Sequence, residues 1–124
     1  MDNGKFPFRH AEHVRFRDCD AMGHVNNAVF STYLEQARIA ILQDLEPYIL
    51  ARVEIDFRAE LRAGEEVEVR SRCSRIGTKS FELEHELHAG DRLVAEAKSV
   101  LVGYDYEAGR SVPLTEDQRR LLAA

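Results

Sequence analysis

A carboxylate and an imidazole lie four residues apart, as Asp20 and His24, within the polar stretch of residues 18–27. The stretch ends in Asn26 and Asn27, residue types that favour the N-cap of a helix, and an apolar helical pattern follows at once. The unpaired N–H groups and the positive dipole end of such a helix can polarise a carbonyl or hold an anion. The sequence therefore predicts part of an active site at a helix N-terminus, namely an acid–base pair of side chains and backbone donors for a carbonyl or an anion.

The helix that would position this site is predicted over residues 28–42. Its apolar residues recur at helical spacing, as Phe30, Leu34, Ala37 and Ile41. This length corresponds to a helix of about four turns.

Charged and apolar residues alternate without interruption over residues 52–61, the pattern of a strand with one buried and one solvent-exposed face. Similar alternation between turn-forming residues predicts three more strands, at residues 67–76, 81–88 and 93–104. One helix followed by these antiparallel strands is typical of an α+β domain in which the sheet wraps around the helix.

Three smaller features complete the prediction of one domain over residues 1–124. A short first strand is expected at residues 13–17, which gives a five-stranded antiparallel sheet. Capping-box spacing from Thr115 to Gln118 predicts a terminal helical turn. Residues 100–102 are apolar on both faces of their strand, so we expect another subunit to cover the second face.

The composition excludes several classes of protein. A net charge of −5 with scattered cations argues against a nucleic-acid-binding surface. We expect no membrane span and no signal peptide, because no apolar run is long enough, and therefore a cytoplasmic protein. Cys19 and Cys73 have neither disulfide-framework nor zinc-site spacing, so both are expected to be free thiols and no metal is expected.

Residues 16–25 and 33–38, together with the strand order, resemble the hotdog-fold thioesterases of the 4-hydroxybenzoyl-CoA thioesterase-like group, which includes the thioesterase associated with the Tol-Pal system. The resemblance covers about residues 13–113 and implies a hotdog fold that hydrolyses acyl-CoA to a free acid and a thiol. No cofactor is implied, since coenzyme A is part of the substrate. A homodimer or a dimer-of-dimers tetramer is implied as the assembly.

The same resemblance implies roles for individual residues. Asp20 maps onto the catalytic carboxylate, acting as base or nucleophile, and the backbone N–H near Asn27 onto the donor that polarises the thioester carbonyl. The segment His24 to Asn27 is similar to that of plant acyl-ACP thioesterases, where an Asp-x-Asn-x-His constellation is implicated, with Met22 here replacing its asparagine. His24 would then transfer a proton or position water.

Each of these residues also has a simpler interpretation. Asp20 is a residue type that forms turns, and His24 can merely hydrogen-bond a loop backbone. Glu35 in the helix is the reserve base, although it can instead pair with Arg38. His85 lies on the apolar face of its strand, where a core or interface histidine is expected.

A coenzyme A substrate carries phosphates that need cations or backbone amides. The turn around Gly77 offers candidates for binding them, and Asn26 is a candidate nearer the reaction; the turn residues are Arg75, Thr78, Lys79 and Ser80. A plain solvated hairpin is the alternative. Acyl carrier protein is a second possible carrier, and a non-catalytic acyl-CoA-binding protein or a hotdog hydratase or dehydratase are the alternative functions.

Overall fold

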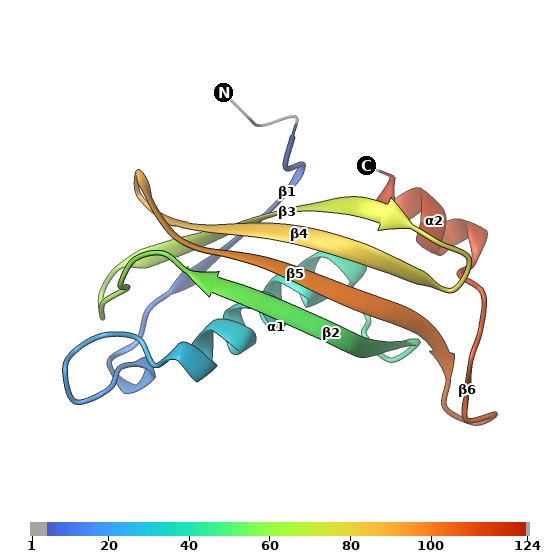
Figure 1. Cartoon of the computed structure of the whole chain (residues 1–124), viewed down its shortest axis with the longest axis horizontal. Helices are drawn as coiled ribbons and strands as arrows, with labels where there is room; N and C mark the ends of the chain where they lie inside the picture. Colours follow the sequence, from blue (N-terminus) through green and yellow to red (C-terminus); the bar gives the residue numbers. More distant parts are fainter. Residues whose placement is uncertain (1–4, 124) are drawn as a thin grey trace.

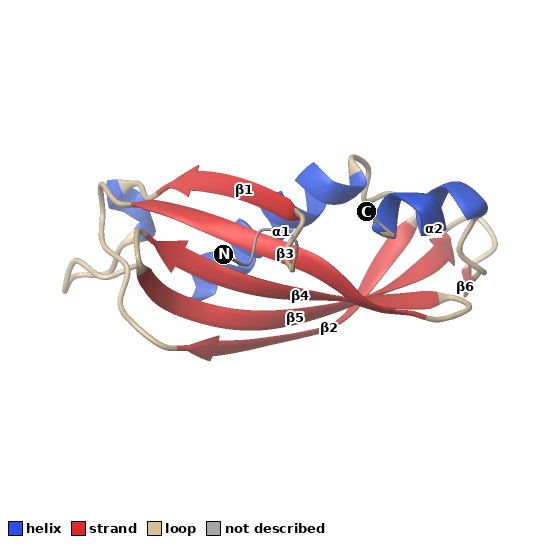
Figure 2. Ribbon diagram, turned by 90° about the horizontal axis from the view of Figure 1, so that it is seen from above, coloured by secondary structure: helices blue, strands red, loops and turns tan. Residues whose placement is uncertain are grey.

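A long helix crosses one face of an antiparallel sheet in the computed structural model of this protein, which describes residues 5–123 (Figure 1, Figure 2). In chain order the elements are β1 (Phe8–His13), the 3-10 helix η1 (Phe16–Asp18), α1 (Asn27–Leu42), β2 (Tyr48–Phe57), β3 (Glu66–Ile76), β4 (Ser80–Ala89), β5 (Arg92–Asp105), β6 (Arg110–Ser111) and α2 (Glu116–Leu122). The strand order in space is β1-β3-β4-β5-β2, and the short β6 pairs with β5. The predicted five-stranded sheet is thus present, with a two-residue sixth strand added.

The helix α1 begins where the sequence pattern predicts it. Asn26 is its N-cap: the backbone there is extended, and the side chain accepts a hydrogen bond from the Ala28 N–H at 3.0 Å. The predicted apolar stripe is buried along its whole length, as Phe30, Leu34, Ala37 and Ile41. It packs on strand residues that include Val67, Val69 and Phe81, so burial of this stripe holds the helix against the sheet.

The predicted first strand at residues 13–17 is wrong. The strand β1 ends at His13, and a turn containing η1 follows it. The carboxylate of Asp18 accepts the backbone N–H of Arg15 at 3.0 Å and its guanidinium Nη2 at 2.8 Å, which closes a turn that an extended chain cannot make. Local side-chain bonding therefore overrides the alternating pattern at this point.

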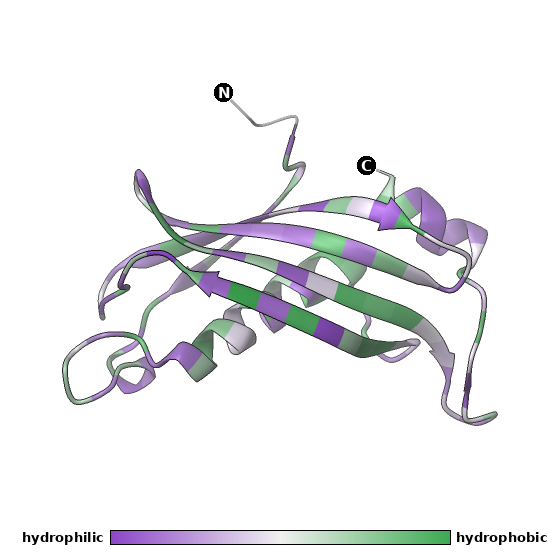
Figure 3. Cartoon of the chain, in the orientation of Figure 1, coloured by the Kyte–Doolittle hydropathy of each residue, from purple (hydrophilic) through white to green (hydrophobic). Residues whose placement is uncertain are grey.

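The strand predicted at residues 52–61 is shifted to residues 48–57 and lies at one edge of the sheet. Among the described strands, β2 pairs only with β5. Hydropathy alternates along β2 (Figure 3), but its apolar side chains are not fully covered. Val53 is 39% exposed and Phe57 is 44% exposed. The predicted buried face of this strand is therefore only partly buried in a single chain.

The helix α2 confirms the capping box and extends the predicted turn. Thr115 accepts the Gln118 backbone N–H at 3.1 Å, and the Gln118 side chain accepts the Thr115 N–H at 2.7 Å. Leu122 at its end is buried in the second part of the core. Within residues 5–123, no helix combines the length and the apolar character needed to cross a membrane.

A chain of polar side chains is buried between α1 and the sheet. His85 Nδ1 lies 2.7 Å from Ser71 Oγ, and His85 Nε2 lies 3.0 Å from Ser99 Oγ. Arg38 donates to the same Ser99 hydroxyl at 3.1 Å. Burial, and then the charge of Arg38, lower the pKa of His85 to about 3, so this histidine is neutral. The expectation of a hydrogen-bonded core histidine is confirmed.

Candidate active site

Residues 20–24 form a tight loop around the Asp20 carboxylate. Asp20 Oδ1 accepts the backbone N–H groups of Met22 at 2.8 Å and of His24 at 3.3 Å. The Asp20 N–H donates to the His24 carbonyl at 2.8 Å, and Gly23 at a φ of 81° allows the chain to turn. Within residues 5–123, both hydrogen bonds to this carboxylate end on Oδ1. The Asp20 carboxylate therefore stabilises its own loop through Oδ1, and Oδ2 can accept a hydrogen bond from a ligand or a water.

The buried carboxylate of Asp18 ties this loop to α1. It accepts the Tyr33 hydroxyl at 2.9 Å, while the Asp18 carbonyl accepts the Asn26 N–H at 2.9 Å. Burial alone would raise the pKa of Asp18, but hydrogen bonds from Arg15 and Tyr33 outweigh burial and lower it. Burial and the bond to Asp18 raise the pKa of Tyr33. Asp18 thus holds the loop that carries Asp20 in position against α1.

The start of α1 leaves a backbone donor next to the loop. The Asn26 side chain accepts the Ala28 N–H, and the Asn26 carbonyl accepts the Val29 N–H at 2.8 Å. None of these bonds uses the N–H of Asn27, which has no intrahelical acceptor because it opens the helix. This group, aided by the helix dipole, can stabilise a negatively charged oxygen.

A cavity of about 560 Å³ lies over the helix start. Its polar lining contains four predicted site residues and two further charged residues, namely Asp20, His24, Asn26, Asn27, Arg58 and Glu60. Its apolar lining consists of Val25, Phe30, Phe57, Ala59 and Leu61. Phe30 and Phe57 meet edge to face with ring centroids 5.1 Å apart. The cavity suits a ligand that joins an apolar group to a polar reacting centre.

Glu60 also lines the cavity, a position that no pattern in the sequence indicates. Its Oε2 lies 2.8 Å from Nε2 of His24 in the cavity lining. In the sequence, Glu60 resembled an exposed residue of an alternating strand, and nothing there linked it to His24. An antiparallel bridge between His24 and Arg62 brings the two segments together.

The remaining predicted residues do not line this cavity. The hairpin turn between β3 and β4 lies at the other end of the sheet (Figure 1). On β5, Val94 bonds the cavity segment and Val102 pairs with Ser80 of the hairpin, and these two positions are about 26 Å apart at about 3.3 Å per residue. Glu35 is exposed on α1 and is absent from the cavity lining. Within one chain, the structure therefore separates these candidates from Asp20: they are Glu35, Arg75, Thr78, Lys79 and Ser80.

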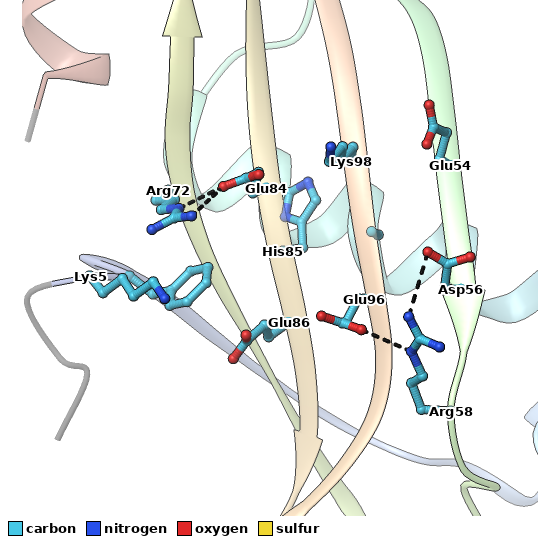
Figure 4. Close-up of a pocket in the computed structure, with 12 residues that line it drawn as sticks. Lys5, Glu54, Asp56, Arg58, Arg72, Glu84, His85, Glu86, Glu96 and Lys98 are labelled. Atoms are coloured by element: carbon cyan, nitrogen blue, oxygen red, sulfur yellow. Dashed lines mark hydrogen bonds and ion pairs between the residues drawn. The ribbon is translucent and has the colours of Figure 1, made fainter.

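A second cavity, of about 360 Å³, lies on the face of the sheet opposite α1 (Figure 4). Charged side chains line it, and both of its arginines are paired with glutamates: Arg72 with Glu84 at 2.7 Å, and Arg58 with Glu96 at 2.8 Å. The guanidinium of Arg72 also lies 5.0 Å from the centre of the Phe6 ring. The two arginines are therefore already neutralised by partners, and the cavity over the start of α1 is the better candidate site.

The described residues offer no metal centre: within residues 5–123, no three His, Cys, Asp or Glu side chains form a group that could hold an ion. Cys19 and Cys73 are both half-buried free thiols.

A family model and two solved structures among the known proteins similar to this chain carry the name thioesterase. A family model described as the thioesterase-like superfamily matches residues 14–122. A thioesterase from Thermus thermophilus, solved in complex with coenzyme A and zinc, is 39% identical with a TM-score of 0.88, over 96% of this chain and 99% of its own. A predicted thioesterase from Bacillus stearothermophilus is 26% identical with a TM-score of 0.88, over 94% of this chain and 93% of its own. The uncharacterized protein YsmA of Bacillus subtilis is 26% identical, over 94% of this chain and 86% of its own length.

Proposed function

This chain belongs to the thioesterase-like superfamily, and on that premise we propose that it hydrolyses acyl-CoA thioesters in the cavity over the start of α1. One observation carries the proposal: a carboxylate, an imidazole and a helix N-terminus line the same cavity as two phenylalanine rings. These groups match the needs of thioester hydrolysis, which are a base or nucleophile, a proton carrier and an oxyanion donor.

Asp20 is the proposed base or nucleophile. As base, it takes a proton from a water while the water oxygen bonds to the thioester carbonyl carbon, and the carbonyl oxygen becomes an oxyanion. The N–H of Asn27 donates to that oxyanion. When the oxyanion reforms the carbonyl, the C–S bond breaks and the departing thiolate takes a proton, for which His24 is the proposed carrier.

We infer the substrate class from a relative whose bound ligand is known. The Thermus thermophilus thioesterase, at 39% identity, was solved with coenzyme A bound. We therefore propose a coenzyme A thioester as the substrate of this chain, with Phe30 and Phe57 against its acyl group. An acyl carrier protein thioester remains the alternative carrier, and the two are separated by assay.

A second copy of the chain is proposed to pair along the open edge of β2. That edge presents unpaired backbone groups together with Leu50, Val53 and Phe57, each between 39% and 44% exposed. A two-fold axis would place two β2 strands antiparallel, which covers the edge and its apolar side chains at once. A dimer of such dimers remains the proposed larger assembly.

This dimer would give the distant hairpin a role. In an antiparallel β2 pair, the Tyr48 end of one strand lies beside the Phe57 end of the other. Tyr48 pairs with Gly103, whose N–H donates to the carbonyl of Lys79 at 2.7 Å, so the hairpin turn is at the Tyr48 end. Arg75, Thr78, Lys79 and Ser80 would then approach the partner's cavity, where they could bind the phosphates of coenzyme A.

The test measures thiol release from short, long and aryl acyl-CoA substrates and from an acyl carrier protein thioester. Wild type should release thiol from at least one acyl-CoA, and the Asp20→Asn variant should not. Tight acyl-CoA binding without thiol release would instead indicate a non-catalytic binding protein. Water addition to an enoyl-CoA would indicate a hydratase. Asp117→Asn, the same change at an exposed aspartate of α2, is the matched control.

A further inference from the structure

We propose that Glu60 is a positioning residue that fixes the tautomer of His24, with the proton on Nε2 and the lone pair on Nδ1. The inference rests on the proposed thioesterase function for its kinetic consequence, but its structural claim stands on the contact itself. Glu60 Oε2 and His24 Nε2 are 2.8 Å apart, and both residues line the cavity that holds Asp20.

The chemistry of the two side chains decides which atom carries the proton. Arg62 donates to the other oxygen of Glu60, Oε1, from Nη2 at 2.5 Å and from Nε at 3.1 Å. The bond from Arg62 is the main cause that lowers the pKa of Glu60, which is therefore ionised at neutral pH. An ionised carboxylate only accepts hydrogen bonds, so the donor in the contact must be Nε2–H of His24. A neutral imidazole has one N–H, which leaves Nδ1 as the acceptor.

The backbone holds both partners of this contact. An antiparallel bridge joins His24 to Arg62, and Arg92 Nη2 donates to the Glu60 carbonyl at 3.1 Å. Arg62, from the same segment, thus fixes the Glu60 carboxylate, and Arg92 of β5 fixes the Glu60 backbone. The other charged groups in the cavity lining are Asp20 and Arg58.

In the proposed reaction, this tautomer leaves the lone pair of Nδ1 to accept a proton and to return it to the departing thiolate. A histidine with the opposite tautomer would present an N–H where the lone pair is needed. Fixing the tautomer therefore raises the fraction of molecules that are ready to react.

Glutamine at position 60 should reverse the tautomer. Arg62 can only donate, so it retains the amide oxygen of the new side chain, and the amide NH₂ group then faces Nε2 of His24. Nε2 must become the acceptor, which moves the proton to Nδ1. In Glu60→Ala, by contrast, the imidazole meets water and exchanges between both tautomers. The Glu60→Gln variant, although isosteric with wild type, is therefore expected to be less active than Glu60→Ala.

The experiment joins NMR spectroscopy with kinetics. Long-range ¹H–¹⁵N spectra of histidine-labelled protein, taken where the imidazole is neutral, should give the Nε2–H form of His24 in wild type and the Nδ1–H form in Glu60→Gln. On the acyl-CoA that wild type hydrolyses best, kcat should fall about 100-fold in Glu60→Gln and about tenfold in Glu60→Ala, with KM nearly unchanged. Glu68→Gln, which alters a glutamate paired with Arg70 on β3, should change neither measurement.

Two results would overturn the proposal: an unchanged Nε2–H tautomer in Glu60→Gln, or a Glu60→Gln variant more active than Glu60→Ala. The second result is what a purely structural role predicts, because glutamine conserves shape better than alanine. If wild type releases no thiol, the thioesterase proposal fails, and the NMR spectra still decide the tautomer of His24.

Discussion

The hydroxyl of Tyr33, in the middle of α1, donates a hydrogen bond to the buried carboxylate of Asp18 at 2.9 Å. This contact joins the helix to the loop that carries Asp20, so the position of the proposed catalytic carboxylate depends on a residue that never touches the cavity. Tyr33→Phe should lower the free energy of unfolding by about 2 kcal/mol, since the lost partner bonded a charged group.

Chemical denaturation checks this value. Tyr104→Phe, in a tyrosine whose ring packs on Tyr106, is the matched control and should unfold near the wild-type midpoint. An unchanged midpoint in Tyr33→Phe would show that Arg15 alone satisfies Asp18.

Asp20→Asn should reduce kcat for thioester hydrolysis at least about 100-fold and leave the fold intact. The amide oxygen can still accept the loop N–H groups that now end on Oδ1, but it cannot take a proton from water. Thiol-release assays measure the loss of kcat, and circular dichroism shows whether the fold is intact. Near-normal turnover in Asp20→Asn, with a dead Glu35→Gln variant, would move the role to Glu35.

His24→Ala should reduce kcat by about 10- to 100-fold if the imidazole carries a proton. The measurement is a pH–rate profile of both proteins. An inflection near neutral pH that persists unchanged in His24→Ala would assign the titration to another group and leave His24 with a packing role.

Stability should fall in acid because of His85. The pKa of this buried histidine is about 3 in the folded chain, against an ordinary value of 6.5. Between these values the unfolded state binds a proton that the folded state does not, so stability decreases as the pH falls through this range. The contribution is about 1.4 kcal/mol per pH unit.

Urea denaturation at several pH values measures this slope. His85→Gln should lose that part of the slope, while His13→Gln, at an exposed histidine on β1, should keep it. Equal slopes in wild type and His85→Gln would contradict the assignment.

Val53→Glu should convert the protein to a monomer, because it places a charge on the helix-facing side of the open β2 edge. Sedimentation at micromolar concentration gives the assembly state. Val100→Glu, on the outer face of β5, is the companion variant: in a dimer of dimers packed through that face it should stop assembly at the dimer. A monodisperse, active wild-type monomer would contradict the proposed pairing of two β2 strands.

Much of the fold follows from local patterns, and the errors have local causes too. The stripe from Phe30 to Ile41 fixed α1, since helical spacing needs only neighbours in sequence. Alternation over residues 52–61 predicted a strand but not its end, because Arg58 and Ala59 leave the ladder to bond the Val94 carbonyl. The first strand was misplaced because Asp18 closes a turn with Arg15, which alternation cannot reveal.

The site was predictable only where its residues are contiguous. Asp20, His24 and the start of α1 lie within one motif, and one cavity contains them. Glu60 reaches His24 across a bridge between two distant segments, and a single sequence carries no signal for that pairing. The place of Phe57 in the cavity could not be predicted for the same reason, since its contact with Phe30 depends on how β2 lies against α1.

Phe57 belongs both to the lining of the cavity and to the exposed edge of β2. In a protein assembled through that edge, catalysis is subject to mass action: dilution separates the copies and uncovers one wall of every site. Turnover per chain would then decline on dilution and recover on concentration. The cell could set this enzyme's output by its abundance, with a steeper than proportional response.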